Sequence, residues 1–260
     1  MPHPVPVSPE EFSDKSWKRP AGLMHAAKDP IVAISLSELS QAALAFPLCF
    51  VKSAESFTLV ALQSLQKDKN LFVSPDGRWL THYIPLAYQL YPFRLANTED
   101  GQLVLCFDSD SGCLVDGAEK EEPFFDASNN LSETVKSIFD ALATSASGNE
   151  RLNEIISFMD ECGLITPWEI SLGDQHKLAG VYKVDEKAFN ALANETYLEL
   201  REMGAITLVY CQLLSMLHLA DLVSLAQSHA ELGQAPAGMD QSELNLDLID
   251  EGGTIDLSNI

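Results

Sequence analysis

Short apolar segments separated by polar turns fill the first half of the chain. They read FPLCFVK (46–52), FTLVALQSL (57–65), NLFVS (70–74), GRWLTHY (77–83) and QLVLCFD (102–108). Aromatic and β-branched residues are frequent in these segments, and each one has the length of a strand. The pattern predicts a meandering antiparallel sheet, preceded by a short helix over 36–45.

The spacing of apolar positions changes to about 3.6 residues after position 131, which is the period of a helix. Segments 132–145 and 149–163 predict two helices joined at Ser147-Gly148. Two further helices follow, with Asp185 and Asn194 as their predicted caps. The next segment, 205–232, is apolar on all sides in its first half, so we expect it to be the central buried helix.

The change of pattern along the chain predicts an α+β fold. We expect an antiparallel, β-rich N-terminal half at 46–126, packed against a helical C-terminal half at 131–231. No internal repeat is visible, and both halves are short enough to share one core. The prediction is therefore a single domain at 31–232.

Two terminal segments differ in composition from this domain. The segment 1–30 is rich in proline and predicts an extended arm that lies over the domain. The tail, 233–260, carries six acidic residues and no basic one. Leu244, Leu246 and Leu248 alternate with polar residues there, so we expect an edge strand that binds a partner or a second copy of the chain.

The densest aromatic stretch, at 70–95, reads NLFVSPDGRWLTHYIPLAYQLYPFRL. Asp76-Gly77 supplies the left-handed backbone of a tight hairpin turn. Pro85 can begin a short helix that Pro92 ends. We call the side chains around this helix the aromatic corner, and its candidate binding residues are Arg78, Trp79, His82, Tyr83, Tyr88, Tyr91, Phe93 and Arg94.

Two interpretations of the aromatic corner stay open. Aromatic side chains dominate core burial, so the corner can be a hinge where the sheet meets the helices. It can equally be an aromatic-lined pocket or peptide groove, with Arg78 or Arg94 as the anchor for an anion. His82 is a functional candidate because it shares a predicted strand with Trp79 and precedes the corner.

Charge restricts the class of partner. The chain holds 38 acidic and 16 basic residues, for a formal net charge of −22. Such a field repels phosphate backbones and anionic lipid headgroups, so we expect no nucleic acid and no direct adsorption to a membrane. The acidity itself favours solubility or a salty habitat, with calcium or a basic protein partner as alternatives. The expectation of a protein or peptide partner rests on the aromatic corner. The uncharged stretch 204–220 is marginal in length for a membrane span, and we expect a buried helix instead.

The cysteines favour a reducing compartment. Five are present, widely spaced and without a CxxC pair, so the sequence suggests neither a disulfide framework nor a zinc site. The first twelve residues also lack the charged start and apolar segment of a secretory signal. We therefore expect a cytoplasmic protein, with export to the cell surface without a cleaved signal as the alternative.

Motifs that would indicate chemistry are absent from the sequence. We find no P-loop, dinucleotide fingerprint, nucleophile elbow or HExxH, and we predict no cofactor and no catalytic residue. A weak calcium alternative rests on Asp108, Asp110 and Glu119, which occupy the first, third and twelfth positions of a calcium loop. Gly112 is fifth where the sixth position requires glycine, so an acidic turn is favoured.

Several of these segments together resemble the SapC family of bacterial proteins, from about Leu23 to Leu225. The resemblance rests on FPLCFV, LVALQSL, NLFVSPDGRW, YIPLAYQLYPF, LCFD, GLITPWEI and GAITLVYCQLLSMLHLADL, in this order. The combination of NLFV..DGRW with Y.P.....YPF is its most specific part. The positions that transfer as family markers, without an assigned role, are Asp76, Gly77, Arg78, Trp79, Tyr83, Pro85, Tyr91, Pro92 and Phe93.

The resemblance implies an association with other proteins, but it identifies no reaction. The family takes its name from a locus for a paracrystalline surface layer, and many members look like companions of TonB-dependent receptors and flavin-dependent halogenase-like proteins. Our first expectation is a non-catalytic binding or accessory protein that recognises a peptide, protein or small molecule through the aromatic corner. The alternatives are an enzyme or obligate enzyme partner in oxidative peptide or aromatic metabolism, and a surface-layer-associated structural protein.

Overall fold

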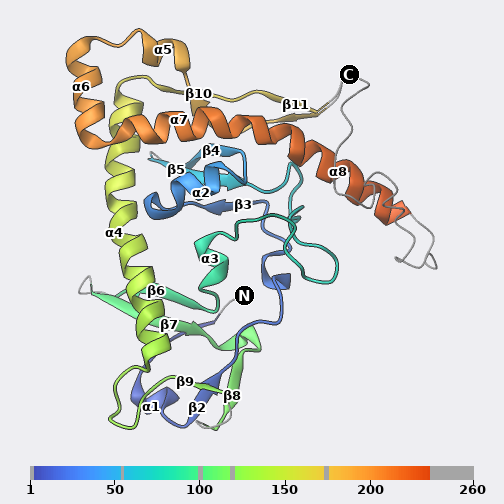
Figure 1. Ribbon diagram of the computed structural model, residues 1–260, viewed down its shortest axis with the longest axis vertical. Helices are drawn as coiled ribbons and strands as arrows, with labels where there is room; N and C mark the ends of the chain where they lie inside the picture. Colours follow the sequence, from blue (N-terminus) through green and yellow to red (C-terminus); the bar gives the residue numbers. More distant parts are fainter. Residues whose placement is uncertain (1–2, 54–55, 99–101, 118–120, 173–175, 235–260) are drawn as a thin grey trace, which may run out of the picture.

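The computed structural model describes residues 3–53, 56–98, 102–117, 121–172 and 176–234 of the 260-residue chain. Two groups of strands lie one above the other beside a single long helix, and the C-terminal helices cover the far end of one group (Figure 1). Antiparallel sheets occupy the N-terminal half and helices the C-terminal half, which confirms the predicted α+β fold.

The larger sheet has five antiparallel strands in the order β10-β13-β4-β5-β3. Its centre is the hairpin β4–β5, where Cys49 pairs with Val60, and this confirms the predicted strands at 46–52 and 57–65. The first three residues of β4 and five of the seven residues of β5 are buried, which explains the apolar runs in their sequences. The strands are β3 Ile31–Ala33, β4 Leu48–Ser53, β5 Ser56–Leu62, β10 Ile165–Pro167 and β13 Val181–Val184.

Two three-stranded sheets form the other end of the molecule. In one, β7 lies between β1 and β6, and in the other β2 lies between β8 and β9. The proline-rich segment 1–30 contributes a strand to each of them, with Val5 opposite Phe107 and Trp17 opposite Leu114. The strands are β1 Pro4–Pro6, β2 Lys15–Trp17, β6 Phe93–Asn97, β7 Leu103–Asp108, β8 Leu114–Asp116 and β9 Glu122–Pro123, and a separate pair is β11 Ile170–Leu172 with β12 His176–Leu178.

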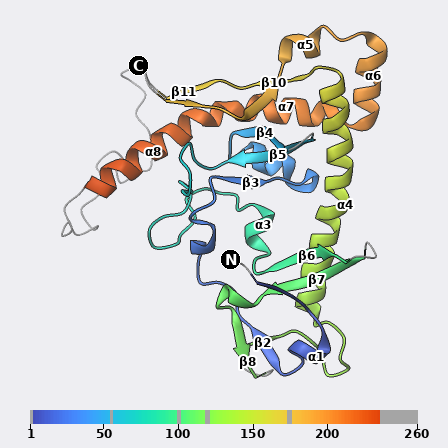
Figure 2. The ribbon, with the colours of Figure 1, turned by 180° about the vertical axis from the view of Figure 1, so that it is seen from behind.

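One helix, α4 (Glu133–Glu161), runs along both groups of strands (Figures 1 and 2). The prediction of two helices joined at Ser147-Gly148 is therefore wrong. A glycine inside a helix costs only about 1 kcal/mol relative to alanine. Apolar faces on both sides of Gly148 are buried, and their burial outweighs that cost.

The remaining helices are short or C-terminal. The predicted helix at 36–45 is present as a 3-10 turn and a helical turn, and the predicted helix after Pro85 is α3. The elements are α1 Pro9–Phe12, η1 Met24–Ala26, η2 Leu36–Glu38, α2 Leu39–Ala43, α3 Leu86–Gln89, η3 Ser109–Ser111, α5 Glu186–Asn190, α6 Asn194–Met203, α7 Ala205–Ser215, η4 Met216–His218 and α8 Leu219–Gln234.

The caps of two C-terminal helices differ in how well the sequence predicts them. The Asp185 carboxylate accepts hydrogen bonds from the backbone N–H groups of Lys187 and Ala188, which confirms it as the cap of α5. Asn194 is the first residue of α6, whose cap is Ala193. The predicted cap is therefore one residue inside the helix, and no side chain caps this end of α6.

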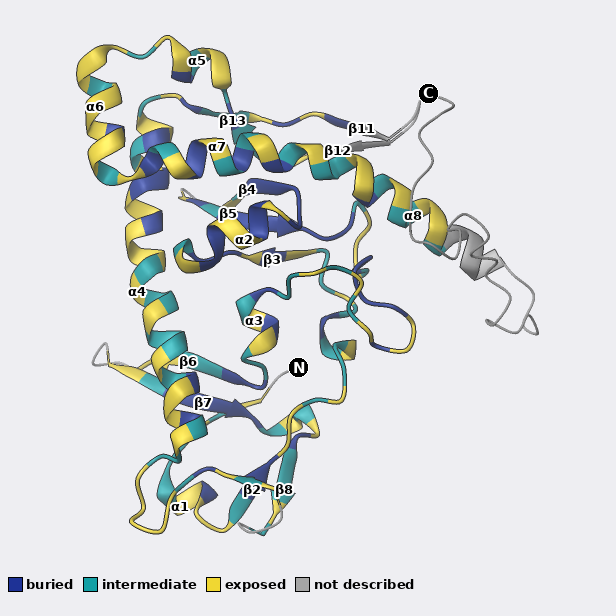
Figure 3. Ribbon diagram, viewed as in Figure 1, coloured by how far each residue is buried: buried dark blue, intermediate teal, exposed yellow. Residues whose placement is uncertain are grey.

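The apolar stretch that begins at 205 is only partly buried, contrary to the prediction of a central helix. α7 buries Leu208 and Val209 toward β4 and β13, while Tyr210, Leu214 and Leu217 are exposed. Figure 3 shows buried and exposed positions alternating along this helix. α7 thus covers the sheet from outside and leaves an apolar face in solvent.

Buried apolar side chains form two clusters. The sheet core surrounds the five-stranded sheet and includes Phe46, Phe50, Leu59, Tyr88 and Ile156. The arm core includes Phe12, Trp17, Phe93, Phe107, Phe124 and Val135. α4 contributes to both, and the chain crosses between them at 18–25 and again at 89–92. We call this boundary the seam.

Candidate functional site

The turn in the aromatic corner is held by side chains. Gly77 has the predicted left-handed backbone, with a φ of +83°. Ser74 Oγ accepts from the backbone N–H of Arg78 at 2.9 Å and donates to the Asp76 carboxylate at 2.5 Å. These side-chain hydrogen bonds hold the turn in place of a regular β-ladder. The segments 70–74 and 77–83, for which the sequence predicts strands, pair only at the isolated β-bridge between Val73 and Trp79.

The turn also fixes residues 18–25, which we call the strap. The backbone N–H of Leu23 donates to the Gly77 carbonyl oxygen at 2.8 Å. A Cβ atom on Gly22 would lie 2.8 Å from the same oxygen, closer than a real Cβ approaches. Glycine at position 22 therefore allows the strap to lie directly against the corner.

Trp79 is half-buried and packs against the sheet core. Its ring lies between those of Phe46, Phe72 and Tyr88, with ring centroids 5.9 to 6.1 Å apart. The indole N–H donates to the backbone oxygen of Tyr83 at 2.6 Å. For this residue the structure favours the interpretation of the corner as a hinge in the core.

A buried carboxylate, Glu38, ties the corner to the sheet. One of its oxygens accepts from both the backbone N–H and the hydroxyl of Ser35 at 3.0 Å, and the other accepts from the Tyr83 hydroxyl and the Leu86 N–H at 2.8 Å. Burial, followed by the hydrogen bond to Glu38, raises the pKa of Tyr83. Tyr83 therefore stays a neutral donor that holds the start of α3.

Tyr88 is fixed by a second buried polar group. Its hydroxyl donates to Gln63 Oε1 at 2.7 Å, and the same oxygen accepts from the Asn70 side chain at 3.1 Å. Burial, followed by the nearby Asp29 carboxylate, raises the pKa of Tyr88, and burial also raises the pKa of Asp29. The Tyr88 ring is thus held in one orientation at the seam.

His25 of the strap stacks on Tyr91. The two rings are 4.0 Å apart and inclined by 10°. Burial lowers the pKa of His25, against a smaller opposite effect from the Gly22 backbone, so its imidazole is neutral at pH 7. Its Nε2 atom is buried and has no hydrogen-bond partner among the described residues. The stack therefore joins the strap to the corner at a second place, besides the Leu23 backbone.

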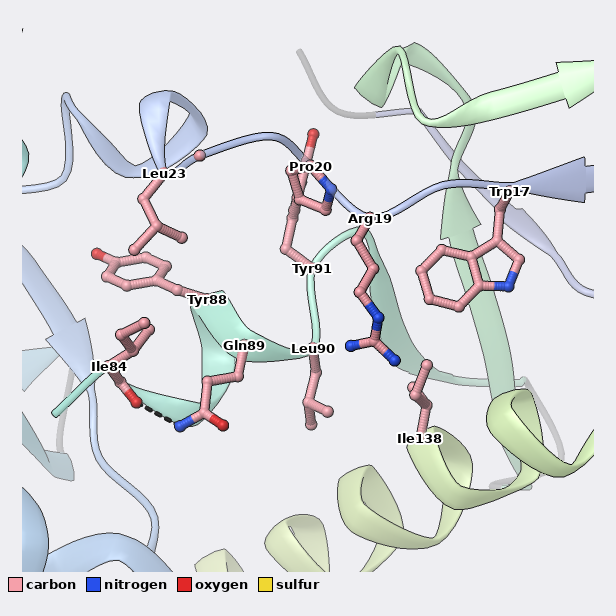
Figure 4. A pocket seen from close by; sticks show the side chains of 11 residues that line it. Trp17, Arg19, Pro20, Leu23, Ile84, Tyr88, Gln89, Leu90, Tyr91 and Ile138 are labelled. Atoms are coloured by element: carbon pink, nitrogen blue, oxygen red, sulfur yellow. Dashed lines mark hydrogen bonds between the residues drawn. The ribbon is translucent and has the colours of Figure 1, made fainter. Parts of the chain in front are cut away.

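A cavity of about 250 Å³ opens at the seam, between the strap and α3 (Figure 4). Its wall is mostly apolar and comes from both cores: Trp17, Pro20, Leu23, Ile84, Tyr88, Leu90, Tyr91 and Ile138. Arg19 extends across it, with its guanidinium carbon 5.6 Å from the Trp17 ring centre and its head directed toward Leu90 and Ile138. One cation thus faces an apolar and aromatic wall.

A second cavity, of about 470 Å³, lies beside the strap. It shares Arg19, Pro20, Gly22 and Tyr91 with the first cavity, and it adds Lys18 and His25 to the wall. The Arg19 Nε atom is 3.6 Å from the Glu122 carboxylate, and the two side chains are 64% and 40% exposed. The other Glu122 oxygen is buried and has no hydrogen-bond partner among the described residues. A ligand carboxylate in either cavity therefore competes with Glu122 for the Arg19 guanidinium.

The structure divides the candidate residues of the aromatic corner into three groups. Tyr88 and Tyr91 line the cavity at the seam. Trp79, Tyr83 and Phe93 pack against or within the two cores. The others do not line that cavity: Arg78, which is exposed and pairs with Asp76 at 2.6 Å, His82, which is exposed, and Arg94, which is half-buried on β6.

Three residues that matter at this site, Trp17, Arg19 and His25, are not among the predicted site residues. All of them lie in segment 1–30, for which the sequence predicts an extended arm. A signal was present in the stretch WKRPAG, where a tryptophan precedes two basic residues in a chain that has few of them.

The weak calcium alternative involves a carboxylate that already has partners. Asp108 Oδ1 accepts from the backbone N–H groups of His3 at 2.9 Å and Asp110 at 3.2 Å, and the Tyr91 hydroxyl lies 3.5 Å from Oδ2. Glu119 lies outside the described residues. Among the described residues, no group of three or more His, Cys, Asp or Glu side chains is placed to hold a metal ion.

Burial keeps the cysteines in their thiol form. It raises the pKa of Cys49 to about 12 and also raises the pKa of Cys106, Cys113, Cys162 and Cys211. A cysteine nucleophile needs a lowered pKa, because the thiolate is the reactive species. These cysteines are therefore suited to packing.

A family model described as SapC matches residues 7–222, which include the strap, the aromatic corner and both cores. The chain belongs to the SapC family. No curated protein and no solved structure matches this SapC chain. The matched span ends within α8, so the family region contains the seam but not residues 223–260.

One helical stretch of this SapC chain, Ala205–His229, is long and apolar enough to cross a membrane by length and composition, among the residues searched. Its most apolar window has a mean hydropathy of 1.6, and 28% of that window is buried. A helix packed on a sheet passes the same test, and α7 packs on β4 and β13.

Proposed function

We propose that this SapC protein is a binding protein whose ligand is an apolar or aromatic group that carries a carboxylate. Arg19 is the observation that carries the proposal, because its guanidinium crosses a cavity with an apolar, aromatic wall. Guanidinium pairs with carboxylate through two parallel hydrogen bonds, and an apolar wall with few polar groups is typical of a ligand pocket. Both parts of the proposed ligand therefore have a complementary surface.

The size of the cavity limits the ligand. At about 250 Å³, the cavity is slightly smaller than pockets for drug-sized molecules, which begin at about 300 Å³. It fits a single amino acid or the last residue of a peptide. The size of the cavity therefore supports a peptide or a small molecule as the ligand. Tyr88 and Tyr91 are the residues of the aromatic corner that would contact it.

The wall of the cavity is formed before the ligand arrives. Tyr88 is held by Gln63, and Tyr91 is stacked on His25. A site whose side chains are already ordered loses little conformational entropy on binding. This arrangement supports recognition of a defined ligand shape.

Binding is favoured over catalysis at this site. The side chains that line the cavity at the seam include no serine, cysteine or lysine nucleophile beside a base. Association with a receptor, a halogenase-like enzyme or a surface layer would be inferred only from the proteins that other family members accompany. None of these associations identifies a further residue of the cavity at the seam. The buried thiols support a cytoplasmic setting for the binding.

Isothermal titration calorimetry of the full-length chain tests the proposal with N-acetyl-phenylalanine, N-acetyl-leucine and N-acetyl-phenylalanine amide. We expect the two acids to bind and the amide to bind more weakly. Arg19→Gln should weaken binding of the acids about tenfold or more, because a charge-assisted hydrogen bond contributes about 1.5–3 kcal/mol.

Arg78→Gln is the matched control, since Arg78 is exposed and does not line the cavity at the seam. It should leave the binding of both acids unchanged. Equal binding of the acid and its amide, equal loss in the two arginine variants, or no binding of either acid would contradict the proposal.

A further inference from the structure

The exposed face of α7 is separate from the seam and apolar. Tyr210, Leu214 and Leu217 are 46%, 64% and 77% exposed. Their spacing of four and three residues places them on one side of the helical stretch that continues from α7 into η4. Figure 3 shows exposed positions on this part of α7.

A groove of about 690 Å³ runs beside this face. The apolar side of the groove is Tyr210, Leu213, Leu214, Met216 and Leu217. The other side comes from the end of β13, the start of α5 and the edge strand β10, and it brings Lys183 and Lys187 together with Asp185 and Glu186. The Asp185 carboxylate already accepts from the first turn of α5.

The chemistry of this groove selects its occupant. Contiguous exposed apolar surface on a monomer marks a binding site. An occupant must bring apolar side chains for the leucines and can bring acidic ones for Lys183 and Lys187. The two lysines of the groove balance Asp185 and Glu186, so in a chain with a net charge of −22 the groove repels an acidic segment less than a surface that carries only acidic residues does.

The C-terminal segment of the same chain has this chemistry. Residues 243–250 read ELNLDLID, in which Leu244, Leu246 and Leu248 alternate with polar or acidic residues. The segment lies outside the described residues. Its leucines match the apolar side of the groove, and its acids match the two lysines.

The chain is long enough for this segment to reach the groove. Seventeen residues separate Leu217 from the end of α8 at Gln234, which is about 26 Å of helix. The ten residues from 235 to Leu244 span up to about 33 Å when extended. Docking of a segment in the same chain is an intramolecular event, so a contact weaker than one between separate chains suffices, provided that the link is nearly extended.

We propose that residues 243–250 fold back and dock in the groove beside α7, with the leucines against Leu214 and Leu217. The docked segment covers the apolar face in the uncomplexed protein. Any external protein segment that uses the same face must displace it.

Photo-crosslinking of the full-length chain tests this. With Leu217→p-benzoylphenylalanine, irradiation should give a crosslink within one chain to residues 243–250, at every protein concentration tested. The same replacement at Leu80, which is exposed in the aromatic corner, is the control and should give no crosslink to that segment. Replacing Leu244, Leu246 and Leu248 by serine should reduce the Leu217 crosslink about tenfold, because the tethered contact loses its apolar side.

Three results would overturn the proposal. They are a crosslink from Leu217 only between two chains, a crosslink to a different segment, and a crosslink to 243–250 whose yield the serine replacements leave unchanged. The serine replacements lie outside the family region, so we expect the variant to fold normally. The circular dichroism spectrum of the variant checks this.

Discussion

Gly22 and Gly77 set how closely the strap approaches the aromatic corner. The Leu23 N–H reaches the Gly77 carbonyl at 2.8 Å because no side chain stands between the two backbones. This contact holds Arg19 at the cavity and His25 on Tyr91. Recognition at the seam therefore depends on backbone geometry as much as on the side chains that would touch a ligand.

Gly22→Ala should lower the free energy of unfolding by about 1–3 kcal/mol, because the new Cβ would collide with a backbone oxygen. Gly148→Ala is the control, since a Cβ there meets only the Leu36 side chain at 3.6 Å. In the interior of α4 it should raise the free energy of unfolding by up to about 1 kcal/mol. Urea unfolding measures both, and the same effect at both positions would contradict the account.

His25 should make the stability depend on pH. Burial lowers its pKa below 6.5, so the unfolded chain binds the proton more readily. The free energy of unfolding should therefore fall as the pH drops from 6.5 toward the folded-state pKa. Asp29, whose pKa burial raises, acts in the opposite direction at lower pH.

His25→Phe keeps an aromatic ring against Tyr91 and removes this titration. We expect the variant to lose less stability than the native chain between about pH 7.5 and 5.5, measured by urea unfolding at each pH. Asp29 is present in both proteins and cancels from the comparison. An identical pH dependence in the two proteins would show that His25 is not desolvated in the folded state.

Elements whose partners are near in sequence follow from the local pattern. The hairpin β4–β5 and the short helix α3 are examples, since a turn or a proline marks their ends. β1 and β2 are not predictable in this way, because they pair with β7 and β8, far along the chain. Local pattern therefore indicates Tyr88 and Tyr91 of the site, but it cannot indicate Arg19 or His25.

The helix α4 shows a second limit of local pattern. Gly148 interrupts good helix-forming sequence, and only the cores on either side of it explain why the helix continues. Ile156 is buried in the sheet core and Val135 in the arm core, so one rigid element connects both. We infer that the two cores unfold together.

Ile156→Ala tests this coupling. It should lower the free energy of unfolding by about 2–5 kcal/mol through the lost burial and the cavity left behind. Tryptophan fluorescence and far-ultraviolet circular dichroism should still report one coincident transition. Glu154→Ala, on the exposed side of α4, should change stability by less than about 0.5 kcal/mol. Two separate transitions in the Ile156 variant would contradict the coupling.

Across the whole molecule, four of the sixteen basic residues lie at the two proposed binding regions. Lys18 and Arg19 line the cavities at the strap, while Lys183 and Lys187 line the groove beside α7. In a chain with a net charge of −22, these basic side chains reduce the repulsion of an anionic group. At the groove, Asp185 and Glu186 offset the two lysines, so the local charge favours an acidic ligand at the strap.

Added sodium chloride should raise the melting temperature of the native chain. Repulsion among the acidic residues opposes the compact state, and the screening length falls from about 10 Å at 0.1 M salt to about 3 Å at 1 M. Thermal unfolding followed by circular dichroism at increasing salt measures this. A melting temperature that falls with added salt would mean that ion pairs, and not net repulsion, dominate the electrostatics.

Chemical-shift mapping of backbone amides, with N-acetyl-phenylalanine added to the full-length chain, tests the seam as a binding site most directly. The account predicts that the largest changes fall in 17–25 and 84–91, with further changes around Ile138. Changes confined to α7 and α8, or spread evenly over the surface, would contradict it.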